Sequence, residues 1–216
     1  GWDGGAGAEM VSGGEPSVLW EPNEFLRGLM EDAGAREAVA RAGECCESES
    51  PIAVDAGCGN GRDAVYLALA LGPAWTVYAI DNHKGALART AELAERSGVA
   101  DRVVTDARNL RAKGLSGLPR PALLHGHRFL DKPLLEAVAA DGGAALGPHG
   151  VLMWGHFLEG CEVFAPPRRK SVQLERGWLR SLCAPPHWNV FEDREAQLST
   201  RNETVPAESF AAARTK

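Results

Sequence analysis

The sequence has no apolar run long enough to cross a membrane. Stretches such as Ala68–Leu71 and Val151–Trp154 fall far short of the roughly 20 residues that a spanning helix needs. An excess of positive charge is also lacking, because 29 acidic residues outnumber 23 basic ones and give a formal net charge of -6. A phosphate backbone binds best to a basic surface, so we expect neither a membrane nor a nucleic acid as partner.

Cysteine is scarce and is badly spaced for a structural zinc site. The chain has five cysteines, and the adjacent Cys45 and Cys46 cannot form one arm of a tetrahedral site with the usual spacing. The odd count favours free thiols in a reducing compartment. We therefore expect a cytoplasmic protein, with an organelle as the alternative.

The beginning of the chain lacks both parts of a signal peptide. Gly1–Gly14 contains neither a charged region nor an apolar core. We interpret residues 1–16 as a disordered tail or linker and residues 17–216 as a single domain. A chain of 216 residues with 44% hydrophobic content suits one core, and the sequence gives no oligomeric state.

Two hydrophobic patterns alternate along the chain. Short apolar runs predict the buried strands Ile52–Asp55, Trp75–Asp81, Arg102–Thr105, Ala122–His125 and Gly150–Trp154. Helical spacing predicts a helix from near Asn23, then Ala35–Ala42, Asp63–Leu71, Lys84–Ser97, Pro133–Ala140 and Arg176–Leu182. This alternation predicts an α/β fold, a doubly wound, mostly parallel sheet with helices on both faces. Trp188–Phe191 and Ser209–Ala213 are expected to close it as antiparallel partners.

A glycine-rich loop between the first predicted strand and the next helix is the strongest local signal. It reads Asp55-Ala56-Gly57-Cys58-Gly59-Asn60-Gly61. Glycines let a backbone turn tightly and approach a ligand, because a Cβ atom would collide with it or forbid the dihedral angles. Since ligands of such sheets bind beyond the carboxyl ends of the strands, the loop predicts a binding site.

Two acidic residues at strand ends define what this loop binds. Asp81 closes the second strand 26 positions after Asp55, where a carboxylate can accept both hydroxyls of a ribose. The loop matches D-x-G-x-G-x-G rather than the dinucleotide pattern G-x-G-x-x-G. A carboxylate suits an ammonium or sulfonium charge and is badly placed beside a pyrophosphate, which disfavours NAD.

The loop resembles motif I of class I S-adenosylmethionine-dependent methyltransferases, and Asp81 resembles their ribose-binding acid. Asp106-Ala107 is similar to the adenine-binding segment after their third strand. The resemblance implies S-adenosyl-L-methionine as cofactor. The cofactor-binding residues that it implies are Asp55, Gly57, Cys58, Gly59, Asn60, Gly61, Arg62, Asp81, Asn82, Asp106, Ala107 and His125.

A narrower resemblance, from Leu19 to Leu158, is to tellurite-resistance-type methyltransferases, some of them fused to rhodanese domains. It is carried by Gly59–Ala68, by Leu19-Trp20-Glu21-Pro22 and by His127–Leu135. The resemblance makes Arg62 a candidate for the carboxylate of the cofactor. The alternative is that Arg62 caps or salt-bridges the start of its helix.

Histidines at the ends of the fourth and fifth strands are candidates for chemistry. Methyl transfer requires alignment of nucleophile and methyl group, and removal of a proton where one is present. His125, His127 and His156 are candidate bases or substrate contacts, and Arg128 could bind an anionic substrate. Three histidines could also hold a metal, but no acidic or cysteine partner has a recognisable spacing, so we expect none.

The absence of one motif narrows the range of possible methyl acceptors. No tetrapeptide like Asn-Pro-Pro-Tyr, typical of enzymes that methylate amino groups of DNA, RNA and glutamine, follows the fourth strand, where His-Gly-His-Arg stands instead. We therefore expect a small-molecule acceptor, a thiol or an oxyanion. The alternatives are a protein or RNA acceptor and a cofactor-binding module without catalysis.

Overall fold

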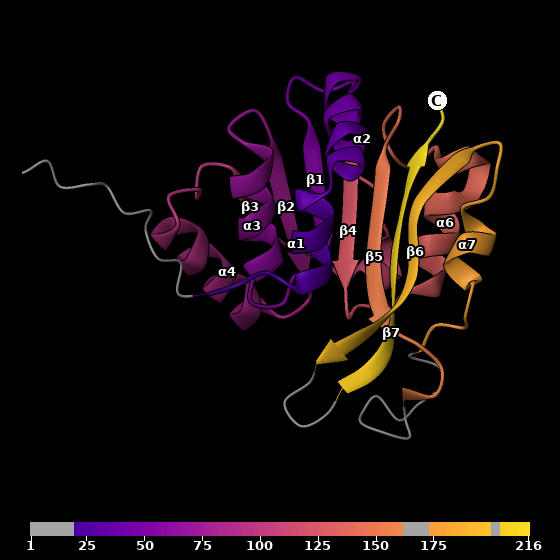
Figure 1. The fold of residues 1–216 in the computed structure, drawn as a ribbon. Helices are drawn as coiled ribbons and strands as arrows, with labels where there is room; N and C mark the ends of the chain where they lie inside the picture. Colours follow the sequence, from indigo (N-terminus) through magenta and orange to yellow (C-terminus); the bar gives the residue numbers. More distant parts are fainter. Residues whose placement is uncertain (1–19, 162–172, 200–203) are drawn as a thin grey trace, which may run out of the picture.

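The computed structural model describes residues 20–161, 173–199 and 204–216, and the expected tail of residues 1–16 lies outside these ranges (Figure 1). The strands form one sheet in the order β3-β2-β1-β4-β5-β7-β6. β1 to β5 run parallel, while β7 is antiparallel to both of its neighbours. The strands are β1 (Ile52–Ala56), β2 (Thr76–Asp81), β3 (Val103–Ala107), β4 (Leu123–His127), β5 (Val151–Phe157), β6 (Trp188–Ser199) and β7 (Thr204–Arg214).

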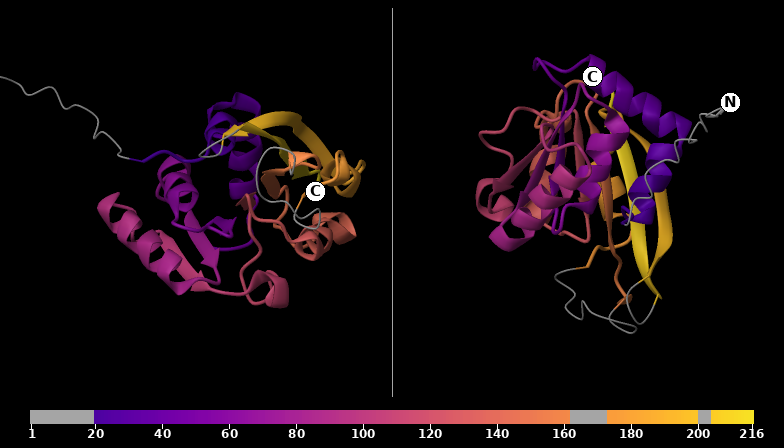
Figure 2. Two further views of the ribbon diagram at one scale, coloured as in Figure 1. Left: turned by 90° about the horizontal axis from the view of Figure 1, so that it is seen from below. Right: turned by 90° about the vertical axis from the view of Figure 1, so that its left-hand side faces the viewer.

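Helices cover the sheet on both faces (Figure 2). On one face lie α1 (Glu24–Glu31), α2 (Ala33–Glu44), α3 (Arg62–Leu71) and α4 (Lys84–Arg96). On the other face lie α5 (Leu110–Lys113), α6 (Lys132–Gly143) and α7 (Trp178–Leu182). No helix among the described residues combines the length and the apolar content needed to span a bilayer.

The central strands are buried on both faces, as in other parallel sheets. On β1, Ala53 packs with the helices of one face, while Ile52 and Val54 pack with those of the other. The alternation continues to Asp55, which follows Ala53 by two positions and so faces α3. The first carboxylate of the glycine loop is therefore part of the interior.

The fold class predicted from the sequence is confirmed, with errors at the edges. The closing strands β6 and β7 are much longer than the predicted Trp188–Phe191 and Ser209–Ala213. The prediction was too short because the paired strands include charged and alanine-rich stretches, which have low strand propensity. The helix expected from Arg176 begins only at Trp178, and the single turn α5 was not expected. In α6, Ala140–Gly142 leave helical geometry.

Candidate functional site

The glycine loop turns sharply between β1 and α3. Gly57, Gly59 and Gly61 all have positive φ, at 72°, 54° and 79°, where a side chain is strained. A Cβ atom at Gly57 would lie 2.6 Å from the ring of Phe129, and one at Gly61 would collide with Thr90. A Cβ atom at Gly59 would meet nothing within 4 Å. Gly57 and Gly61 are therefore needed for close packing, whereas the Gly59 backbone borders open space.

A cavity of about 560 Å³, which we name the loop cavity, lies beside this turn. Its wall includes Gly57 of the loop and Asp81 and Asn82 at the end of β2. Asp81 Oδ2 accepts a hydrogen bond of 3.0 Å from the Gly59 N–H, and Oδ1 accepts one of 2.8 Å from the His83 N–H. Each carboxylate oxygen keeps a lone pair for a ligand, so Asp81 can both shape the loop and bind hydroxyl groups.

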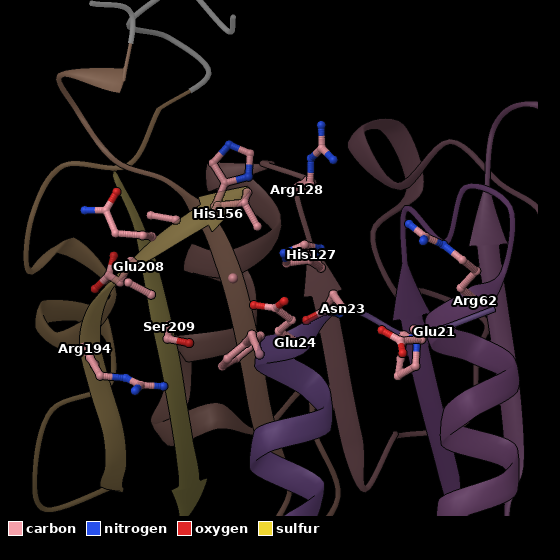
Figure 3. Close-up of a pocket in the computed structure, with 17 residues that line it drawn as sticks. Glu21, Asn23, Glu24, Arg62, His127, Arg128, His156, Arg194, Glu208 and Ser209 are labelled. Atoms are coloured by element: carbon pink, nitrogen blue, oxygen red, sulfur yellow. The ribbon is translucent and has the colours of Figure 1, made fainter. Parts of the chain in front are cut away.

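A second cavity of about 490 Å³, the strand-end cavity, lies at the carboxyl ends of β4 and β5 (Figure 3). Its walls come from the segment Glu21–Phe25, from Arg62 at the start of α3, from His127, Arg128 and His156 at the strand ends, and from the β6–β7 hairpin. Arg128 lines this cavity and the loop cavity alike. The two cavities therefore share one lining residue.

Arg128 is held in an uncommon conformation. Its φ is 57°, a left-handed value that costs free energy for a residue with a side chain. Its backbone N–H donates to the Gly155 oxygen at 2.8 Å, and its guanidinium lies 5.3 Å from the ring centre of Phe157. It forms no ion pair with any described residue, and the same holds for Arg62. Both cations are thus available to an anionic ligand.

His127 is partly buried beside Arg128. The pKa of its imidazole is lowered to about 3, chiefly by burial and also by the positive charges of His125, Arg128 and His156, against the opposing effect of Asp63. The imidazole is therefore neutral at neutral pH and offers one donor and one acceptor nitrogen. Within the described ranges, no three His, Cys, Asp or Glu side chains are grouped so that they could hold a metal ion.

A buried polar cluster lies under the loop. His125, fully buried, faces Asp63 with 3.4 Å between Nε2 and Oδ2. Burial alone would lower the pKa of His125, but the hydrogen bond to Asp63 and the charge of Asp55 raise it. Burial alone would raise the pKa of Asp63, but His125 and two hydrogen bonds from Asn23 bring it well below its ordinary range. Asp55, only 2% exposed, has its pKa raised to about 7, chiefly by burial.

Eight predicted site residues line neither cavity, and two of them are Gly59 and Gly61 of the loop. The positions of the other six have physical reasons. Asp55 faces α3 from inside the sheet, and His125 lies two positions deeper along β4 than His127. The Cys58 sulfur lies 4.0 Å from Thr90 Oγ1, on the packed side of the loop. Asp106 is paired with Arg108 at 2.9 Å, and Arg108 rather than Asp106 or Ala107 lines the loop cavity. Asn60 accepts a hydrogen bond of 2.7 Å from Arg89.

Several residues around the cavities were not predicted. Arg108 and Phe129 line the loop cavity, and both follow the ends of predicted strands, which was an available signal. Glu208 and Arg194 of the hairpin line the strand-end cavity. Glu208 is 4% exposed, and burial, followed by the charge of Asp193, raises its pKa to about 7. No motif in the sequence indicated that the hairpin forms part of a cavity wall.

Parts of this chain are similar in sequence to known methyltransferases. Residues 53–116 match the model of a methyltransferase domain family. A stretch of 69 residues is 44% identical to a probable cobalt-precorrin-6B C(15)-methyltransferase (decarboxylating) of Pyrobaculum calidifontis. That stretch covers 32% of this chain and 35% of the relative, so only about a third of the relative is matched.

Two solved structures show how far the similarity of fold extends. One concerns the conversion of a disulfide bond into a thioacetal group during echinomycin biosynthesis; it has a TM-score of 0.56 and 20% identity over 83% of this chain and 80% of the other. The other is an rRNA methylase of Streptococcus thermophilus, with a TM-score of 0.54 and 16% identity over 86% of this chain and 99% of the other.

The fold is the Rossmann-like methyltransferase fold. With the domain match, it supports a class I S-adenosylmethionine-dependent methyltransferase and implies S-adenosyl-L-methionine as the methyl donor. The residues present fit this molecule. The buried Asp55 Oδ2 atom has no hydrogen-bond partner among the described residues, Gly59 borders open space, and Asp81 faces the loop cavity. A cationic nucleoside with ribose hydroxyls matches these groups in charge and in hydrogen bonding.

Proposed function

We propose that this chain transfers the methyl group of S-adenosylmethionine to a small-molecule acceptor bound in the strand-end cavity. The observation that carries the proposal is the position of Arg128 on the walls of both cavities. A methyl group passes in line from donor to acceptor, so the two sites have to be contiguous. A cofactor-binding module without catalysis has no need of a second, contiguous cavity.

The cofactor site is formed by the loop cavity and the first residues of α3. Asp81 accepts the ribose hydroxyls, and the Gly59 backbone lies against the ligand without a side chain between them. Arg62, unpaired among the described residues, binds the carboxylate of the methionine part, as the family resemblance implies. When bound, the cofactor supplies a methyl group on a positively charged sulfur. Asp55, whose carboxyl has its pKa raised to about 7 by burial, lies beneath the loop and lines neither cavity.

The acceptor is a small anion, of the thiolate or oxyanion type. A cavity of about 490 Å³ has the size of a small-molecule site. The Arg128 guanidinium, which has no ion pair among the described residues, can hold an anion by two parallel hydrogen bonds. His127, with its pKa lowered to about 3, is a weak proton acceptor at neutral pH, which suits an acceptor that arrives deprotonated. His127 and His156 then serve as hydrogen-bonding contacts.

The resemblance to tellurite-resistance-type enzymes supports an oxyanion, and the fold relative that concerns thioacetal formation supports sulfur. The rRNA methylase relative would favour an RNA acceptor. We place the small anion first because the net charge of -6 opposes a polyanion. Cys45, Cys46, Cys58 and Cys183 have free thiols, which supports a reducing compartment such as the cytoplasm. Residues 17–216 stay predicted as one domain.

An acceptor panel tests this function. The protein is incubated with methyl-labelled S-adenosylmethionine and, separately, small thiols, metalloid oxyanions, small amines and RNA, and transfer of label is measured. We expect label on a thiol or an oxyanion, with none on RNA. Label on RNA alone would overturn the small-molecule acceptor, and a protein that binds the cofactor yet labels nothing would favour the non-catalytic module.

A further inference from the structure

A contact between two distant parts of the chain closes one side of the strand-end cavity. The Asn23 backbone N–H donates to Asp63 Oδ1 at 2.9 Å, and its side-chain Nδ2 donates to Asp63 Oδ2 at 2.6 Å. The two residues are 40 positions apart, in the segment before α1 and in the first turn of α3. One carboxylate thus holds the N-terminal segment by two charge-assisted hydrogen bonds, which are stronger than neutral ones.

The same amide of Asn23 also begins α1. Its Oδ1 atom accepts a hydrogen bond of 2.8 Å from the Leu26 N–H, the usual N-cap contact. Capping and the contact to Asp63 use opposite ends of one amide group. The side chain can make both contacts in only one placement of α1 relative to α3, so the pair fixes the direction in which α1 leaves the segment Glu21–Phe25.

This segment is a wall of the strand-end cavity rather than a remote support. All five residues from Glu21 to Phe25 line the cavity. The Phe25 ring is stacked on His125 with 6.4 Å between ring centres, and a Cβ atom added at Gly155 would lie 3.0 Å from it. Phe25 and Trp20 also pack against the hydrophobic core. The Asp63 contact therefore holds a wall close to His127 and Arg128 (Figure 3).

We propose that Asp63 is a positioning residue that fastens the segment Glu21–Phe25 through Asn23 and thereby sets the affinity for the methyl acceptor but not for the cofactor. The inference rests on the proposed function, because it assigns the strand-end cavity to the acceptor. Asp63 itself lines neither of the two cavities, so it acts through the segment. The loop cavity contains no residue of that segment. Arg62, which lines the strand-end cavity but is assigned to the cofactor, forms no hydrogen bond or ion pair with the segment.

Two single variants separate this role from a simple charge effect. Asn23→Asp keeps an N-cap oxygen for α1 but turns a donor into a carboxylate that faces Asp63. Asp63→Asn removes a negative charge and leaves two amide donors opposed. For an anionic acceptor, charge alone would raise KM in the first variant and lower it in the second. We expect a rise of about tenfold in both, as for the loss of one or two such hydrogen bonds, with kcat changed less.

The double variant Asn23→Asp with Asp63→Asn exchanges donor and acceptor and restores both the total charge and the hydrogen bond. We expect it to recover most of the affinity for the acceptor. Asp32→Asn is the matched control, because Asp32 caps α2 through the Ala35 N–H and has no hydrogen bond to Asp63. Its KM should equal that of the unaltered protein.

Amide hydrogen exchange of residues 20–31 gives a readout that needs no acceptor. We expect faster exchange in both single variants and normal exchange in the double variant. Titration with S-adenosylhomocysteine should give the same affinity in all four variants. If the unaltered protein binds no cofactor, the proposed function fails. If it binds cofactor and transfers methyl groups while the single variants keep KM and exchange unchanged, only the role of Asp63 is overturned.

Discussion

Asp81 and Gly59 are joined by a hydrogen bond of 3.0 Å from the glycine N–H to the carboxylate. The bond connects the end of β2 to the loop that follows β1, so one side chain shapes the loop and faces the cavity beside it. Loop shape and ligand binding depend on the same residue. Variants of this pair therefore test the cofactor site.

Asp81→Ala should weaken the binding of S-adenosylmethionine by about 1–3 kcal/mol, the scale of lost charge-assisted hydrogen bonds. Calorimetric titration measures the change. Asp101→Ala is the control, because the Asp101 side chain is 79% exposed and forms an ion pair with Arg102. Equal affinities in the two variants would remove Asp81 from the site.

Gly59→Ala should abolish most of the cofactor affinity while the protein stays folded. The added methyl group meets no protein atom, so it occupies space that we assign to the ligand. Gly98→Ala is a matched control, because Gly98 also has positive φ, at 70°, and open space around it, but lies after α4 rather than in the loop that is hydrogen-bonded to Asp81. Both variants should lose about 1 kcal/mol of stability from the strained backbone, and thermal unfolding measures that loss. A similar affinity in both would mean that Gly59 does not face the cofactor.

Arg128→Lys should raise KM for the acceptor by about tenfold or more, because an ammonium keeps the charge but cannot form two parallel hydrogen bonds. Steady-state kinetics with the acceptor found in the panel measures the effect. Arg96→Lys, in an exposed pair with Glu92, is the control. An unchanged KM in Arg128→Lys would show that the guanidinium does not bind the acceptor.

The pKa of Asp55 predicts how stability depends on pH. Its carboxyl has a pKa of about 7 in the folded protein, above the value of 3.8 for a free side chain. A raised pKa stabilises the fold below pH 3.8, and that contribution is lost as the pH rises to about 7. Glu208, also raised to about 7, acts in the same direction.

Asp55→Asn should therefore lose less stability than the unaltered protein when the pH rises from about 4 to about 7. Urea unfolding at several pH values measures the two slopes. Asp101→Asn, which alters an exposed carboxylate, should leave the slope unchanged. Parallel curves for the unaltered protein and Asp55→Asn would show that the pKa of the Asp55 carboxyl is not raised in the folded protein.

Local patterns predicted the parallel strands and most helices, because buried strands and amphipathic helices leave a periodic record in the chain. They also placed Asp81, Asn82, His127, Arg128 and His156 at strand ends, where the structure has them on cavity walls. The depth of a side chain depends on what packs over it, and no periodicity records that. Hence the sequence did not reveal that Asp55 and His125 line neither cavity.

Contacts between residues far apart in the sequence could not be predicted either. The hydrogen bonds between Asn23 and Asp63 span 40 positions, so only the folded chain reveals them. The hairpin residue Glu208 lies beyond Leu158, where the resemblance to known enzymes ends. The sequence therefore did not predict that the hairpin forms a wall of the strand-end cavity. Both of these unpredicted features belong to the strand-end cavity, which we assign to the acceptor.

The most direct test of the account is calorimetric titration of the full chain with S-adenosylmethionine, repeated with Gly59→Val. The account predicts saturable binding at one site in the unaltered protein and no detectable binding in the variant, with the variant still folded by circular dichroism. The absence of binding to the unaltered protein, or equal affinity in a folded variant, would contradict it.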